Sequence, residues 1–163
     1  MKTPRADEIP VPSIVNELNL LDRVDYQDAY VVETPVHWTP EHWMRAIIED
    51  APRWFLLPWI NLLGRGIMRA RVGPLNAPGY VLGAKIIVDR ADAFALGLDG
   101  AGKLGVRLIT LTPPGQAVFA TQIRFGALMM RTAWPAIRTG HRFFAPFLLS
   151  RAAQAMNNDA GSN

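Results

Sequence analysis

The second half of the chain alternates between hydrophobic and polar residues with a period of two. From Gly79 onward, one side of the pattern is formed by Tyr80, Leu82, Ala84, Ile86 and Val88. Such alternation is typical of a half-buried β-strand. It returns at residues 94–98, 106–112 and 118–125, with the hairpin signal Asp99-Gly100 between two of these segments. The pattern predicts four consecutive strands that form an antiparallel meander.

The first half of the chain adds one strand and two helices. Residues 26–34 are rich in Tyr and Val, which favours a strand. Thr39-Pro40-Glu41 places an N-cap residue, a proline at the first helical position and an early acid in order, which predicts a helix start. Pro52 ends this helix. Pro58 starts or kinks a second helix, whose hydrophobic residues continue to Ala70.

A long helix follows the strands, from Ala127 to about Ala153. Its hydrophobic positions recur at steps of four and three residues, which places them on one helix face. The members of this face are Met130, Trp134, Ile137, His141, Phe144 and Leu148. Pro135 and Pro146 should each kink the helix or remove a hydrogen bond.

These elements predict one α+β domain. A length of 163 residues suits a single domain, since domains run to roughly 100–200 residues. Residues 1–24 form an N-terminal leader with a possible short helix from Ser13 to Leu21. Residues 25–153 form the domain, with two helices between the first and second strands, and residues 154–163 form a disordered polar tail.

Composition narrows the class of protein. Half of the residues are hydrophobic, so the chain is not intrinsically disordered. The absence of cysteine excludes a disulfide scaffold, a thiol nucleophile and Cys-ligated zinc, and it fits the reducing cytoplasm. The start of the chain lacks the apolar core of a signal peptide. The most hydrophobic window, residues 54–63, contains a proline and is half the roughly twenty residues that a spanning helix needs, so we expect no transmembrane segment.

The net charge of +3 hides an asymmetry. Residues 1–50 hold four bases and ten acids, whereas residues 51–151 hold thirteen bases and three acids. Such a split indicates an anionic partner, or two halves that neutralise each other when they pack together. The sequence has no helix-turn-helix, zinc finger or aromatic RNA-binding signature, which disfavours nucleic-acid binding.

The order of elements resembles the helix-grip architecture of the START and pollen-allergen-like (SRPBCC) superfamily. The local sequence is similar to a family of uncharacterised bacterial domains near that superfamily. The matching segments are Asp25-Tyr-Gln-Asp-Ala-Tyr30, Pro52-Arg-Trp54 and His141-Arg142. The resemblance implies a curved antiparallel sheet that wraps the C-terminal helix and leaves an apolar cavity between them. It implies no particular reaction, and our five strands are fewer than the six or seven of the full helix-grip sheet.

His141 is the most informative single residue, because it is polar on an otherwise hydrophobic helix face. In a grip fold this face borders the cavity, where His141 would orient a ligand. The alternative is a core histidine that is hydrogen-bonded to a backbone carbonyl. Arg131, Arg138 and Arg142 lie about a quarter-turn away. They would bind an anion at the cavity mouth, or form a solvated stripe that pairs with the acidic half.

Other reactive groups form no recognisable site in the sequence. His37 and His42 are five residues apart across Pro40, which does not match the spacing of metal-ligating histidines on a helix, so we expect no metal. No serine lies in a Gly-x-Ser-x-Gly context, which disfavours covalent serine catalysis. No cofactor is expected.

We therefore predict non-catalytic binding of a hydrophobic small molecule, such as a lipid, a polyketide or an aromatic compound. The predicted ligand-binding residues are Phe119, Phe125, Trp134, Ile137, Arg138 and His141. One alternative is a cyclase or hydratase-like enzyme that uses His141 as general acid–base in the same cavity. Another is a module that contacts a membrane surface or a protein through residues 54–63. Hydrophobic residues on most sides of the last helix also suggest a homodimer.

Overall fold

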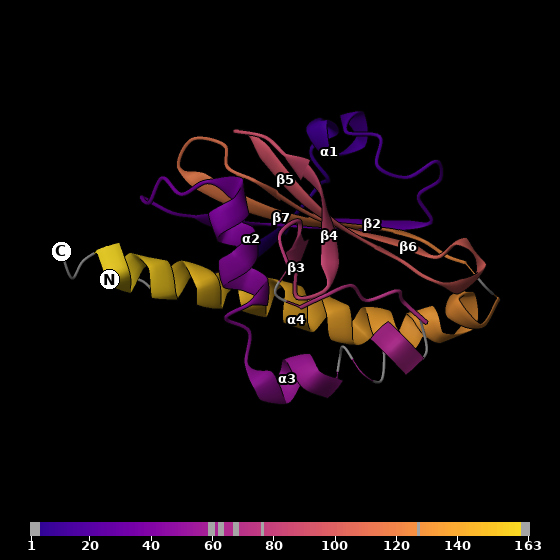
Figure 1. Cartoon of the computed structure of the whole chain (residues 1–163). Coiled ribbons are helices and arrows are strands. Elements are labelled where there is room, and N and C mark those ends of the chain that lie inside the picture. Colours follow the sequence, from indigo (N-terminus) through magenta and orange to yellow (C-terminus); the bar gives the residue numbers. More distant parts are fainter. Residues whose placement is uncertain are drawn as a thin grey trace.

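The structure is a computed structural model of the α+β class, in which an antiparallel sheet packs on a long C-terminal helix (Figure 1). It describes residues 4–58, 61, 64–66, 69–75, 77–126 and 128–160, without the side chains of residues 129 and 130. The strands are β1 (Asp7–Ile9), β2 (Tyr26–Glu33), β3 (Tyr80–Val81), β4 (Ala84–Asp89), β5 (Ala93–Asp99), β6 (Gly105–Leu111) and β7 (Gln116–Arg124). The α-helices are α1 (Ser13–Glu17), α2 (Pro40–Ile48), α3 (Arg53–Pro58) and α4 (Leu128–Ala160), and a 3-10 turn covers Ala101–Lys103.

The strands of the described residues form one sheet in the order β1-β2-β7-β6-β5-β4-β3, and every neighbouring pair is antiparallel. The meander from β4 to β7 confirms the period-two pattern of the sequence. The first long strand, β2, lies beside the last strand, β7, with Asp28 opposite Thr121. The first and last long strands of the chain are therefore neighbours, close to the edge of the sheet that β1 forms.

Our count of five strands was wrong, because the sheet has two further short strands. Residues 7–9 of the leader pair with β2 as β1. The predicted strand from Gly79 is split into β3 and β4 by a tight turn at Leu82-Gly83, where φ is 45° and 83°. Two positive φ values define the hairpin turns that fit the twist of strands. A Cβ on Gly83 would also lie 2.3 Å from Val72 Cγ1, so only glycine fits here.

The helices of the first half differ in part from the prediction. Helix α2 begins as expected, with the Thr39 hydroxyl accepting a hydrogen bond from the backbone N–H of His42. Helix α1 ends at Glu17 rather than at Leu21. Helix α3 begins at Arg53, so Pro58 lies at its end rather than at its start. The predicted burial of Trp59, Ile60, Leu62, Leu63 and Ile67 falls outside the described residues.

Helix α4 is continuous through both prolines and longer than predicted. It reaches Ala160, so residues 154–160 are helical where the sequence suggested a frayed tail. The last turns pack against the core through Ala152, Ala153 and Met156, which explains why the helix continues. Pro135 and Pro146 have no backbone N–H, so each leaves one carbonyl of the preceding turn without its helical hydrogen bond. The carbonyls of the prolines themselves accept hydrogen bonds from the hydroxyls of Thr139 and Ser150.

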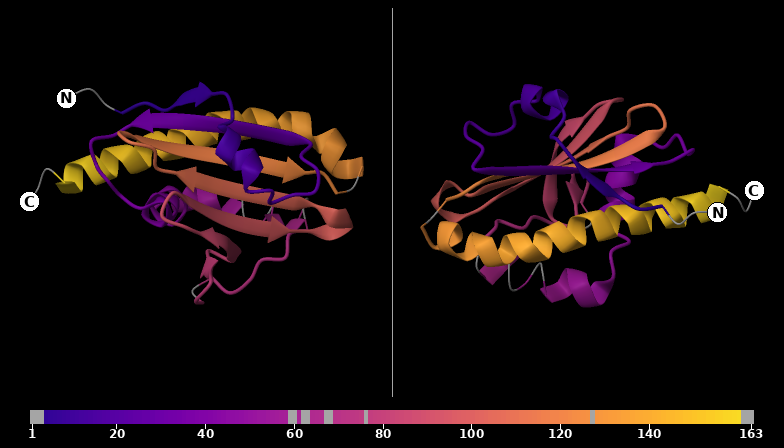
Figure 2. Two further views of the ribbon diagram at one scale, coloured as in Figure 1. Left: turned by 90° about the horizontal axis from the view of Figure 1, so that it is seen from above. Right: turned by 180° about the vertical axis from the view of Figure 1, so that it is seen from behind.

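Helix α1 lies on one face of the sheet and helix α4 on the other (Figure 2), and a layer of buried hydrophobic residues lies on each face. On one face, α4 runs across the strands and α2 packs between α4 and β5–β6. On the opposite face, α1 and the adjoining leader cover β2, β5, β6 and β7. Because side chains alternate along each strand, neighbouring residues of β2 belong to different layers.

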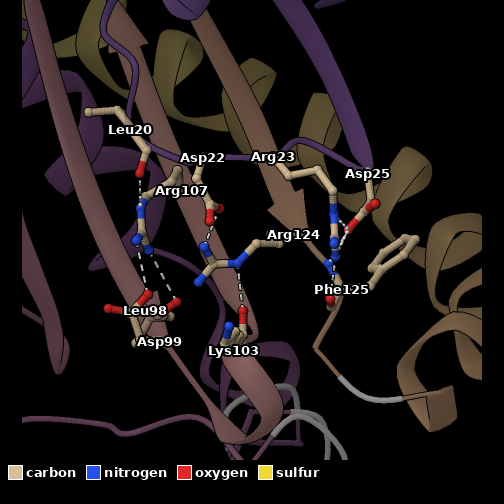
Figure 3. A network of polar contacts seen from close by, with 10 residues as sticks. All are labelled: Leu20, Asp22, Arg23, Asp25, Leu98, Asp99, Lys103, Arg107, Arg124 and Phe125. Carbon is tan, nitrogen blue, oxygen red and sulfur yellow. Dashed lines mark hydrogen bonds and ion pairs between the residues drawn. The ribbon is translucent and has the colours of Figure 1, made fainter.

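The segment between α1 and β2 is held to the sheet, near the start of β6 and the end of β7, by a network of polar contacts (Figure 3). Arg107 donates to the carbonyl of Leu20 and pairs with Asp99, and Arg124 pairs with Asp22. The acidic and basic halves of the chain therefore meet here, and again where Arg142 of α4 pairs with Glu8 of β1. Other ion pairs lie within one half, as between Arg45 and Glu41.

Candidate functional site

A cavity of about 170 Å³ lies between the sheet and α4. Its lining residues come from β3–β7, from α2, α3 and α4, and from the connections between them. Apart from Thr121, His141 and the indole N–H of Trp134, the lining side chains are hydrophobic. A mostly hydrophobic enclosure with a few polar groups is the usual composition of a small-molecule site.

Helix α4 provides one wall of the cavity, through the face that the sequence pattern predicted. The lining members of this face are Trp134, Ile137, His141, Phe144 and Leu148. Met130, which the pattern also placed there, has its side chain outside the described part of the chain. The opposite wall includes Phe119 on β7, another of the predicted ligand-binding residues.

Two predicted ligand-binding residues do not line the cavity. Phe125 packs on the indole of Trp134, with ring centroids 5.5 Å apart, and so supports the wall from behind. Arg138 lies over the ring of Tyr26, with its guanidinium carbon 5.6 Å from the ring centroid. The structure therefore places Arg138 in a cation–π contact rather than in the cavity wall.

His141 contacts a buried carboxylate, a partner that the sequence did not indicate. Its Nε2 atom lies 3.0 Å from Oδ2 and 3.3 Å from Oδ1 of Asp28. Asp28 is only 5% exposed. The hydrogen-bond partner of His141 is thus a side chain of β2, and not a backbone carbonyl as the alternative interpretation of the sequence had it.

Two tyrosines complete the surroundings of Asp28. The hydroxyl of Tyr26 donates to Asp28 Oδ2 at 2.7 Å, and that of Tyr30 donates at 3.3 Å. The three residues are spaced two apart on β2, so they share the face that points toward α4. The sequence does contain a signal for this site: Tyr26, Asp28 and Tyr30 occupy alternate positions of one predicted strand, so an acid lies between two phenols on the same face.

The pKa directions fit a charged carboxylate with neutral donors. Burial raises the pKa of Asp28, but the contacts with His141 and with the two tyrosine hydroxyls lower it by more. The pKa of Asp28 is therefore below its usual value. Burial and the nearby Asp28 raise the pKa of both Tyr26 and Tyr30. These phenols therefore stay protonated and remain hydrogen-bond donors at neutral pH.

The other candidate residues lie apart from the cavity. His37 and His42 are exposed, and His42 stacks on Trp38 with ring centroids 4.1 Å apart. Within the described ranges, no group of three or more His, Cys, Asp or Glu residues could hold a metal ion. The same part of the chain contains no helix that is long and apolar enough to cross a membrane.

The segment 54–63 is described only in part. Trp54 and Leu57 are exposed, whereas Phe55 lines the cavity and stacks on Phe144 with ring centroids 3.9 Å apart. Trp59, Ile60, Leu62 and Leu63 lie outside the described residues. The described part thus contributes both to the cavity and to the protein surface.

Comparisons with protein-family models, with curated proteins and with solved structures found no match for this chain. The cavity and the contacts of His141 are therefore the observations that bear on function.

Proposed function

We propose that the protein binds a small hydrophobic molecule in the cavity between the sheet and α4. The observation that carries this proposal is an apolar cavity of about 170 Å³ whose wall includes the half-buried His141. Hydrophobic walls favour an apolar ligand because binding removes apolar surface from water. A polar group in such a wall orients the ligand.

The volume indicates the size of the bound group. An engineered protein cavity of about 150 Å³ with hydrophobic walls admits benzene. The cavity of about 170 Å³ described above is close to that size, so it suits a single aromatic ring or a short aliphatic chain. Among the ligand classes expected from the sequence, a small aromatic compound fits these dimensions best.

We also infer a relationship to the helix-grip superfamily. The support is the sheet order, in which the first long strand β2 lies beside β7, together with a C-terminal helix that crosses one face of the sheet. Helix α2 and helix α3 lie between β2 and β3, in the element order on which the superfamily resemblance was based.

A cavity-filling variant tests the binding proposal. Ala145 of α4 is buried and lines the cavity, so Ala145→Phe should occupy the ligand space. Ala136 is an exposed residue of the same helix, and Ala136→Phe is the matched control. Toluene binding, followed by NMR titration of the amide signals, should be seen in the wild type and in Ala136→Phe but not in Ala145→Phe. Equal binding in the two variants would show that toluene binds elsewhere.

A second candidate function is turnover of the bound molecule. The observation that favours it is the Asp28–His141 pair at the cavity wall, since a carboxylate that orients an imidazole is a common arrangement for general acid–base catalysis. His141→Gln separates the two functions. A catalyst would lose its turnover while ligand affinity remained measurable, whereas a binding protein would show no turnover of any bound compound.

A further inference from the structure

The two ring nitrogens of His141 have different surroundings. Nε2 is held by the Asp28 carboxylate at 3.0 Å. Nδ1 has no hydrogen-bond partner within the part of the chain that the structure describes. His141 is one of the residues that line the cavity, and its side chain is 12% exposed. Nδ1 is therefore the hydrogen-bonding atom that His141 can offer to a ligand.

The orientation of the ring is set by β2. Asp28 lies in the middle of this strand, and its carboxylate accepts hydrogen bonds from Tyr26 and Tyr30. These two contacts, together with burial, leave the carboxylate little freedom to turn. The bond to Nε2 then determines which edge of the imidazole faces away from β2.

The charged groups around this pair do not favour an anionic ligand. Asp28 itself is an acid directly behind His141. On α4, Arg138 lies over the Tyr26 ring and Arg142 is paired with Glu8 of β1. Neither arginine belongs to the cavity lining. A carboxylate or phosphate would therefore lose its hydration without gaining a paired cation.

We infer that Nδ1 of His141 binds the hydroxyl group of an uncharged, single-ring aromatic ligand, and that Asp28 is the positioning residue that presents Nδ1. This inference rests on the proposed binding function and specifies its ligand class as a phenol. A hydroxyl suits the site because it can both donate and accept a hydrogen bond, and therefore matches Nδ1 in either protonation state. The remaining cavity wall would cover the ring.

The test compares phenol with toluene, which has nearly the same shape but replaces the hydroxyl by a methyl group. Affinities for both are measured by NMR titration in the wild type and in His141→Phe. The ratio of phenol to toluene affinity should fall about five- to ten-fold in His141→Phe, the usual effect of one lost hydrogen bond. Comparing ratios cancels the different hydration of the two compounds. His42→Gln, which removes an exposed histidine, is the control and should keep the wild-type ratio.

Benzoate extends the same test to charge. It has the same ring as phenol but carries a carboxylate, and it should bind more weakly than phenol to the wild type. Benzoate binding tighter than phenol would overturn the inferred ligand class.

The role of Asp28 needs a readout that loss of stability alone would not change. The nitrogen-15 NMR signals of the His141 ring report which nitrogen carries a proton. In the wild type Nε2 should be protonated, and Asp28→Asn should change these signals and lower the phenol-to-toluene ratio. If Asp28→Asn does not fold, the wild-type spectrum still decides, because an unprotonated Nε2 would overturn the positioning role.

The possible outcomes separate this inference from the proposed function. If neither toluene nor phenol binds the wild type, the binding function fails and the ligand class fails with it. If both bind and His141→Phe leaves their ratio unchanged, the cavity binds ligands but His141 does not select them. A reduced ratio in His141→Phe together with a protonated Nε2 supports the inference.

Discussion

The two faces of the sheet use the same strands but are built from different side chains. On β2, Asp28 and Tyr30 point toward α4, whereas Ala29 and Val31 belong to the layer beneath α1. The layer beneath α1 contains the buried alanines Ala29, Ala93, Ala95 and Ala120. The layer toward α4 contains Trp, Phe and Tyr side chains, and its residues line the cavity.

This difference explains where a ligand site can form. The leader and α1 cover the aliphatic residues of this layer, and the arginines of Figure 3 hold the adjoining segment near the start of β6 and the end of β7. Aromatic rings lie between the sheet and α4, and Phe119, Trp134 and Phe144 are among the residues that line the cavity there. On the proposed function, the layer toward α4 holds the ligand site in addition to the larger buried core, whereas the layer beneath α1 has a structural role alone.

The largest expected effect is a loss of stability on truncating a buried side chain, which we compare between the two layers. Ile109 is fully buried beneath α1, and Ile109→Ala should lower the free energy of unfolding by about 2–5 kcal/mol. Leu148 lines the cavity and is 8% exposed, so Leu148→Ala should cost less and should improve binding of ligands larger than toluene. Urea denaturation and NMR titration measure these effects. A larger stability loss for Leu148→Ala would contradict the division of roles.

The next effect concerns the buried acid on the α4 side. The folded pKa of Asp28 is lowered from 3.8, so the folded state binds fewer protons than the unfolded state. This contribution to stability is present above the unfolded pKa and is lost as pH falls through the lowered folded pKa. Asp28→Asn should cost about 1–3 kcal/mol at pH 7 and make the loss of stability below about pH 4 less steep.

Urea denaturation at a series of pH values from 7 to 3 measures this dependence. Asp25→Asn is the matched control. The pKa of Asp25 is also lowered, but Asp25 is exposed, just before β2. Asp25→Asn should change the acid limb less than Asp28→Asn. Parallel curves for the wild type and Asp28→Asn would show that the pair with His141 does not stabilise the fold.

The sequence predicted the fold class and one wall of the site. The period-two alternation identified the meander, and the spacing of Trp134, Ile137, His141, Phe144 and Leu148 identified the α4 face. Both patterns are local, and they persist because each element buries one face. The split at Leu82-Gly83 was missed because it depends on backbone dihedral angles, which hydrophobicity does not report.

The partner of His141 was missed for a different reason. Asp28 and His141 are separated by 113 residues, and only the pairing of β2 with β7 and the crossing of α4 bring them together. The contact of Arg138 with the Tyr26 ring was likewise not indicated by the sequence, because a helix phase gives a direction but no partner. Contacts of this kind require the tertiary structure.

The smallest expected effect tests whether a polar contact on the α1 side is separate from ligand binding. Gln122 is buried on that face, and its side-chain amide donates to Asn16 of α1 and to Gln27 of β2. Asn16→Ala removes one of these two acceptors. Because Gln27 still accepts a hydrogen bond and Asn16 is exposed, the free energy of unfolding should fall by only about 0.5–1 kcal/mol. Toluene affinity should stay at the wild-type value, since the contact lies across the sheet from the cavity. A change in affinity without a change in stability would show that the two layers are coupled, and the functional division between the faces would then have to be abandoned.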